Sequence, residues 1–84
     1  MNNKTIDVIV TFNKAGKIRP NYIRLEDDDQ LMHTYKIYNP RFDHEEKFAG
    51  TAALLFSCYI INNGCKQMIK IKYHANTYQW ILVD

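Results

Sequence analysis

The sequence predicts an all-β domain of about six strands that folds as a small antiparallel barrel of the SH3-like kind. A two-layer β-sandwich is the alternative. Three observations lead to this fold class. Several short stretches alternate apolar and polar residues with the period of two that a strand requires. Turn-forming residues separate these stretches, and no segment keeps a helical period beyond one or two turns.

The length and composition describe an ordinary small globular domain. The chain has 84 residues, of which 46% are hydrophobic and 24% are charged, so we expect one domain over residues 1–84. No apolar stretch is long enough to span a membrane, and the first residues do not form a secretory signal. We therefore expect a cytoplasmic protein, in which Cys58 and Cys65 are free thiols.

The first two strands are expected over residues 5–12 and 17–25, with a turn at Gly16 between them. In the first strand one face carries Ile6, Val8, Val10 and Phe12, while Ile9 is an apolar exception on the other face. The second strand contains Pro20, which has no N–H to donate. Pro20 is therefore expected at a sheet edge, at a bulge, or before the strand proper.

The middle of the chain gives a weaker pattern. An acidic stretch over residues 26–30 is expected to be a solvated loop, and residues 31–38 a third strand with Tyr35 and Ile37 facing inward. Residues 39–50 break the alternation and begin with Asn39-Pro40, a pair that favours a turn. We expect this segment to be the longest irregular loop, with room for one helical turn.

The last third of the chain can be assigned residue by residue. Asn63-Gly64 is the preferred pair for a two-residue type I′ turn, which joins a strand over residues 51–61 to the next one. That turn fixes the pairing. One face then pairs Leu54 with Tyr73, Phe56 with Ile71 and Cys58 with Ile69, and the other pairs Leu55 with Lys72, Ser57 with Lys70 and Tyr59 with Met68.

The final turn is expected at residues 74–77, with Tyr73 opposite Tyr78 and Ile71 opposite Trp80. Both turns then place the same residues of the fifth strand on the core face, and this agreement supports the assignment. Tyr73, Tyr78 and Trp80 are expected in the core. Lysines alternate with them because a strand alternates its faces.

The outer face of the last three strands is the first candidate site. Leu55 shares it with five other apolar residues, and exposed apolar patches usually mark a contact surface. We expect a protein partner or a second copy of the chain to bind there, unless another segment covers the face. The five predicted partner-binding residues are Tyr59, Ile61, Met68, Ile81 and Val83.

Weak, sequence-tolerant binding of RNA or single-stranded nucleic acid is the alternative function. Basic residues and an aromatic lie along the second strand, and lysines lie on the outer face of the fifth, where they would hold phosphates. The net charge of +2 is far below that of a dedicated DNA-binding domain. The residues of this alternative are Lys17, Arg19, Tyr22, Arg24, Lys70 and Lys72, with Tyr59 as a stacking platform.

Catalytic, metal and cofactor sites are not expected. The acidic residues 26–29 lack the ligand spacing, the glycine and the distal glutamate of a calcium loop. The histidines and cysteines lack the spacing of a zinc site, and Cys65 and His74 fall at opposite ends of one strand. His44 lies among carboxylates in a polar segment, and no nucleophile or phosphate-binding motif accompanies it.

The sequence resembles a group of small, uncharacterised bacterial proteins. They carry a G-x-I-x-P motif at the first hairpin, a Tyr-x-Ile strand and a tryptophan in the last strand. The resemblance covers most of the chain and implies a small all-β domain, without implying any functional residue. The matching positions here are Gly16, Ile18, Pro20, Tyr35, Ile37, Tyr73 and Trp80.

Overall fold

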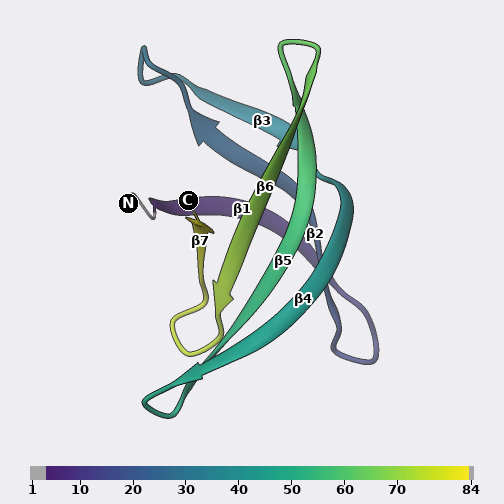
Figure 1. Cartoon of the computed structure of the whole chain (residues 1–84), viewed down its shortest axis with the longest axis vertical. Coiled ribbons are helices and arrows are strands. Elements are labelled where there is room, and N and C mark those ends of the chain that lie inside the picture. The colour runs from purple at the N-terminus through teal and green to yellow at the C-terminus, as the bar shows by residue number, and fades with distance from the viewer. Residues whose placement is uncertain (1–3, 84) are drawn as a thin grey trace.

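A computed structural model describes residues 4–83 as seven antiparallel strands, one more than the sequence predicts (Figure 1). Residues 1–3 and 84, which the predicted single domain over 1–84 includes, lie outside the described residues. The described part contains no helix long and apolar enough to cross a membrane. The strands are β1 Lys4–Phe12, β2 Ile18–Glu26, β3 Met32–Lys36, β4 Tyr38–Phe48, β5 Thr51–Asn62, β6 Cys65–His74 and β7 Gln79–Val83.

The strands form a single curled sheet in the order β3-β2-β1-β7-β6-β5-β4. The prediction of an all-β domain is confirmed, whereas the predicted closed barrel and the two separate sheets of a sandwich are wrong. A barrel needs its edge strands to pair, and in the described chain β3 and β4 form no ladder with each other. β1 produces much of the curl, because its first residues pair with β7 and the rest pair with β2.

The chain passes directly from one edge of the sheet to the other at Ile37. The amide of Ile37 donates to the carbonyl of Asn21 in β2 at 2.9 Å, whereas the next residue, Tyr38, pairs with Tyr59 in β5. Asn39 then has a φ of 49°, a value at which asparagine is tolerated. Because Ile37 is buried, this crossing brings β3 and the start of β4 against the core that β5 and β6 form.

β4 is the strand that the sequence pattern does not predict. Residues 39–50, expected to be irregular, belong almost entirely to this 11-residue strand, which pairs with β5 through two bulges. Its turn, Ala49-Gly50, has φ values of 52° and 83°. Both are positive, as a type I′ turn requires, but alanine rarely occupies such a position, so the sequence gives no hairpin indication.

The predicted register of β5 and β6 is confirmed at every pair, from Asn62 opposite Cys65 to Leu54 opposite Tyr73. The predicted register of β6 and β7 is wrong by two residues, because Tyr73 faces Trp80 and not Tyr78. A shift of two preserves the faces of a strand, so Trp80 is still buried. Tyr78 instead lies in the turn with a φ of 58° and is 81% exposed, so its assignment to the core is wrong.

Pro20 lies within β2, at the bulge that was one of its three expected positions. Ile9 pairs with Tyr22 and Val10 pairs with Pro20, so Asn21 is the extra residue. The β2–β3 ladder begins only at Tyr22. The missing N–H of Pro20 therefore interrupts no pairing with β3, although β2 is an internal strand.

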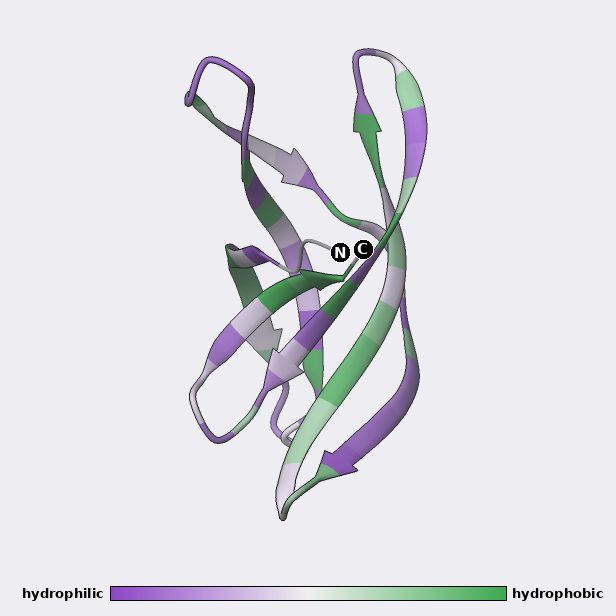
Figure 2. Cartoon of the chain, turned by 60° about the vertical axis from the view of Figure 1, so that its left-hand side comes forward, coloured by the Kyte–Doolittle hydropathy of each residue, from purple (hydrophilic) through white to green (hydrophobic). Residues whose placement is uncertain are grey.

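The core lies on the concave face of the curl, where β5, β6 and β7 meet β2. Figure 2 shows apolar colour along β5 beside the hydrophilic end of β4. Phe12, predicted on the apolar face of β1, is 57% exposed because it lies at the end of the strand. The buried cluster contains Ile23, Ile37, Phe56, Cys58, Ile60, Ile69, Ile71, Tyr73 and Trp80, with Tyr35 and Ile6 packed against it.

Candidate functional site

The predicted partner-binding residues lie together on the outer, convex face of β5, β6 and β7. Tyr59 of β5 pairs with Met68 of β6. In the β6–β7 ladder, Lys70 pairs with Val83 and Lys72 pairs with Ile81. Only Met68, at 67%, and Ile61, at 44%, are exposed, whereas the other three are half-buried. The apolar surface on this face is therefore small and lies between lysines.

A polar bridge covers one end of the outer face. Lys72 Nζ lies 3.1 Å from Glu46 Oε1 across β5, and His44 Nε2 lies 3.6 Å from the other oxygen of Glu46. Leu55, expected on the outer face, is buried at 7% beneath these side chains. The contact with Lys72 holds the pKa of Glu46 below its ordinary value. Because Lys72 is engaged with this carboxylate, the structure gives little support to its role in phosphate binding.

The other end of the outer face carries a stack of two tyrosines between two lysines. The rings of Tyr38 and Tyr59 are 5.2 Å apart and nearly parallel, with 16° between their planes. Lys66 Nζ lies 4.4 Å from the centre of the Tyr59 ring, and Lys36 Nζ lies 5.2 Å from that of Tyr38. Each exposed contact of this kind contributes about 0.5–1 kcal/mol.

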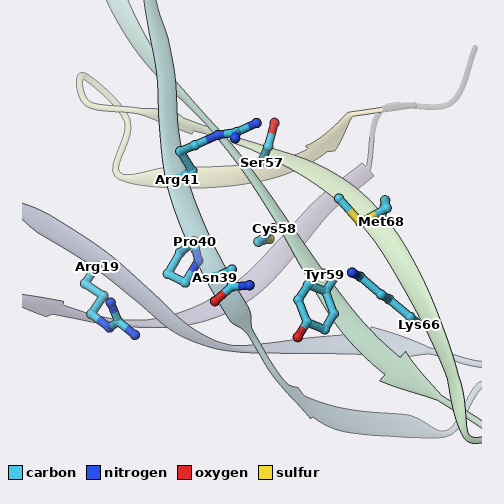
Figure 3. A pocket seen from close by; sticks show the side chains of 9 residues that line it. All are labelled: Arg19, Asn39, Pro40, Arg41, Ser57, Cys58, Tyr59, Lys66 and Met68. Atoms are coloured by element: carbon cyan, nitrogen blue, oxygen red, sulfur yellow. The ribbon is translucent and has the colours of Figure 1, made fainter.

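A groove of about 520 Å³ lies beside this stack (Figure 3). Arg19 enters from β2, Arg41 from β4 and Lys66 from β6, so three strands that are not sheet neighbours each supply one cation. Figure 3 shows Lys66 reaching toward the ring of Tyr59, and Arg41 extending toward Ser57. The remaining lining residues are Asn39, Pro40, Ser57, Cys58, Tyr59 and Met68.

The charge of this groove is positive. None of the described residues that line it is acidic. One carboxylate, Asp43, lies nearby, 3.8 Å from Arg41, and it also accepts a short hydrogen bond from the hydroxyl of Ser57. Arg41 is thus paired with one carboxylate, while Arg19 and Lys66 form no ion pair with any carboxylate in the described part. The groove is therefore lined by three cations and suits an anionic ligand.

The residues proposed for nucleic-acid binding are only partly brought together. Arg19 lines the groove, and Lys70 of β6 lies opposite Ser57, which lines the groove from β5. Lys17 lies in the β1–β2 turn, while Arg24 on β2 is 3.9 Å from Asp7. Tyr22 is exposed and lies opposite Lys36 in the β2–β3 ladder.

Four residues of the basic surface were missed, namely Lys36, Tyr38, Arg41 and Lys66. The register that follows from Asn63-Gly64 puts Lys66 diagonal to Tyr59, so this contact was accessible from the sequence. The other three depend on the crossing at Ile37, for which no local pattern exists.

Within residues 4–83 the two thiols and the histidines do not gather into a metal-binding group. Burial raises the pKa of the Cys58 thiol to about 11, which keeps it protonated, and Cys65 is exposed at the far hairpin. No group of three or more metal-ligating side chains occurs within residues 4–83.

Comparison of the chain with protein-family models, with curated proteins and with solved structures found no match. The resemblance to small bacterial all-β proteins therefore stays a prediction, and the groove must be interpreted from its own chemistry.

Proposed function

We propose that this chain is a binding module for single-stranded nucleic acid, and that the groove between Arg19, Arg41 and Lys66 holds a phosphate of the backbone. One observation carries the proposal: three separate strands direct cations into one groove that has no acidic lining residue. Single-strand binders combine such positive grooves with aromatic side chains on which bases stack.

The stack beside the groove provides a route to base binding. Lys66 covers one face of Tyr59, and Tyr38 covers the other. Moving Lys66 from the ring to a phosphate costs a contact of about 0.5–1 kcal/mol. A base that takes its place on the ring gains about 1–3 kcal/mol. The exchange is favourable, so Lys66 protects the ring in the free protein and contacts phosphate in the complex.

The proposed affinity is modest. The net charge is +2, and the groove supplies three cations. The slope of log K against log salt for single strands is about −0.7 for each neutralised phosphate. We therefore expect binding that is measurable at low salt and weak at physiological salt.

The test is fluorescence anisotropy of labelled single-stranded RNA and DNA at low and at near-physiological salt. We expect binding that weakens as salt rises, and a double variant Arg19→Gln/Lys66→Gln that binds about tenfold more weakly with a shallower salt slope. Lys14→Gln, in the exposed β1–β2 turn, removes one charge away from the groove and is the control for net charge. No binding at low salt, or an equal loss of affinity in Lys14→Gln and in the double variant, would contradict the proposal.

Self-association or protein binding through the outer apolar residues is the second candidate function. Its supporting observation is Met68, which is 67% exposed between the groove and a second hollow lined by Val83, Leu82 and Ile69. Met68→Glu or Ile81→Glu is expected to abolish such association while the fold survives. The protein's mass in solution tests this, and an unchanged assembly in both variants would exclude it.

A further inference from the structure

We propose that this chain also binds a small amphipathic anion, an alkyl or aromatic group with one carboxylate or sulfonate, in a second cleft that shares no lining residue with the basic groove. The cleft lies between the β1–β2 turn and the inner face of β4 and β5. Its volume is about 380 Å³, within the range of small-molecule sites. It is lined by Gly16, Lys17, Ile18, Phe42, Leu54 and Phe56.

The walls of this cleft are apolar and partly open to solvent. Phe42 stands edge-on to Phe56, with ring centres 5.8 Å apart, and it is 53% exposed. Leu54 and Ile18 are half-buried and belong to the margin of the core. Phe56 in turn contacts Trp80 at 5.7 Å, so the inner wall of the cleft is fixed by the core. A bound apolar group would cover Phe42 without requiring the core to move.

The charge at the cleft selects the kind of ligand. Among the described residues that line it, Lys17 alone is charged. Glu45, opposite Leu54 in the β4–β5 ladder, is on the same face but does not line the cleft. A ligand with an apolar body and a single negative charge therefore matches both the walls and Lys17. This site shares no lining residue with the basic groove, although Ile18, Phe42 and Phe56 are chain neighbours of Arg19, Arg41 and Ser57 in that groove.

The experiment uses the fluorescence of anilinonaphthalene sulfonate, an aromatic sulfonate, titrated with the folded protein. We expect saturable binding that Phe42→Gln weakens about tenfold, because the ring provides much of the exposed wall. Lys17→Gln, in an exposed turn where misfolding is not a concern, is expected to weaken it about threefold. Ile9→Gln removes an apolar side chain that is also 53% exposed, from β1 and outside the lining of the cleft, and should leave binding within about twofold.

A competition experiment tests the charge of the ligand. Decanoate is expected to displace the probe at a lower concentration than decanol, because only decanoate can pair with Lys17. The proposal is overturned by the absence of saturable binding to the folded protein, or by Ile9→Gln weakening binding as much as Phe42→Gln. Equal displacement by decanol and decanoate would overturn the anionic part. Since RNA binding is measured separately, the failure of one site does not affect the other.

Discussion

Asn13 and Asp27 organise two turns in the same way, although the turn sequences differ. Each side chain accepts two backbone hydrogen bonds through its Oδ1, from the residues two and four positions later. The distances are 2.9 and 2.9 Å for Asn13, from Ala15 and Lys17, and 2.8 and 2.9 Å for Asp27, from Asp29 and Leu31.

Both turns also carry a positive φ three residues after the organising side chain, at Gly16 (81°) and at Gln30 (64°). The acidic segment over residues 26–30, expected to be a solvated loop, is therefore a turn held by side-chain hydrogen bonds from Asp27. Asp27 makes a further contact, since its Oδ2 lies 2.6 Å from Nε2 of His33. The hydrogen bond from the Leu31 amide, followed by that from His33, lowers the pKa of Asp27 below its ordinary value.

Asp27→Asn is expected to keep both backbone hydrogen bonds, as Asn13 does, and to lose the charge together with the carboxylate oxygen that contacts His33. A carboxylate whose pKa is lowered in the folded state contributes stability that is fully present above its ordinary pKa and is lost as pH falls through the folded value. The variant should therefore have a slightly lower Tm at pH 7, and the difference should shrink as the pH falls below about 4, where the carboxyl begins to take up its proton.

Thermal unfolding followed by circular dichroism at pH 7 and pH 3 measures this difference. Asp28→Asn removes a charge from the neighbouring position and is the control. A gap in Tm that is the same at both pH values would show that the charge of Asp27 contributes nothing.

At the scale of single elements, the hairpins β4–β5 and β5–β6 have the same kind of turn with different residues. Asn63-Gly64 has φ values of 52° and 77°, and Ala49-Gly50 has 52° and 83°. Asparagine tolerates a left-handed backbone because its short side chain can hydrogen-bond locally, whereas the Cβ of alanine raises the cost by about 1–2 kcal/mol. β4 and β5 therefore pair despite their turn, through their long ladder.

Exchanging the two residues should have opposite effects. Ala49→Asn is expected to raise the free energy of unfolding by about 1 kcal/mol, and Asn63→Ala to lower it by about the same amount. Urea unfolding followed by the fluorescence of Trp80 measures both. Because both turns are exposed, other contacts should change little. A loss of stability in Ala49→Asn would show that the strain assigned to this turn is absent.

β4 forms an exposed edge of the sheet, which is a place where another chain can add a strand. Three features of the strand oppose such pairing. Bulges interrupt the ladder before Arg41 and before His44, Pro40 has no N–H, and charged side chains follow from Asp43 to Lys47. These residues explain why the segment gives no strand pattern in the sequence: the composition that protects an edge also hides its periodicity.

At the scale of the whole molecule, the curled sheet has one core to which both ends of the sheet contribute. Ile23 in β2 is fully buried against residues of β5, β6 and β7. The described chain should therefore unfold as one cooperative unit, in which β1 to β3 and the β5–β6 hairpin unfold together.

Ile23→Ala is expected to destabilise the protein by about 2–5 kcal/mol, the usual cost of a cavity in a core. A domain of this size has about 5–10 kcal/mol in total, so the variant should be marginally stable. Urea unfolding measured by Trp80 fluorescence and by circular dichroism should give coincident transitions, although Ile23 and Trp80 lie in different strands. Ile9→Ala, at a 53% exposed position of β1, is the control and should cost less than about 1 kcal/mol. Two separated transitions would contradict the single core.

The basic groove is also a property of the whole molecule. Arg19, Arg41 and Lys66 are far apart in the sequence, and the curl of the sheet together with the crossing at Ile37 brings them to one place. The sequence identified the basic character of β2 and the outer face of β6. It did not show which cations share a groove and which, like Lys72, are already paired with a carboxylate.

The sequence by itself determined the all-β class, the β5–β6 register and the burial of Trp80, Tyr73 and Ile71. These depend on turn residues and on the alternation of side chains, which act within a few positions along the chain. Tertiary structure alone decided that residues 39–48 form a strand, that the sheet stays open, and that the cations of three strands meet beside Tyr59. These features depend on backbone pairing and side-chain contacts between distant segments, whose energies no local stretch of sequence contains.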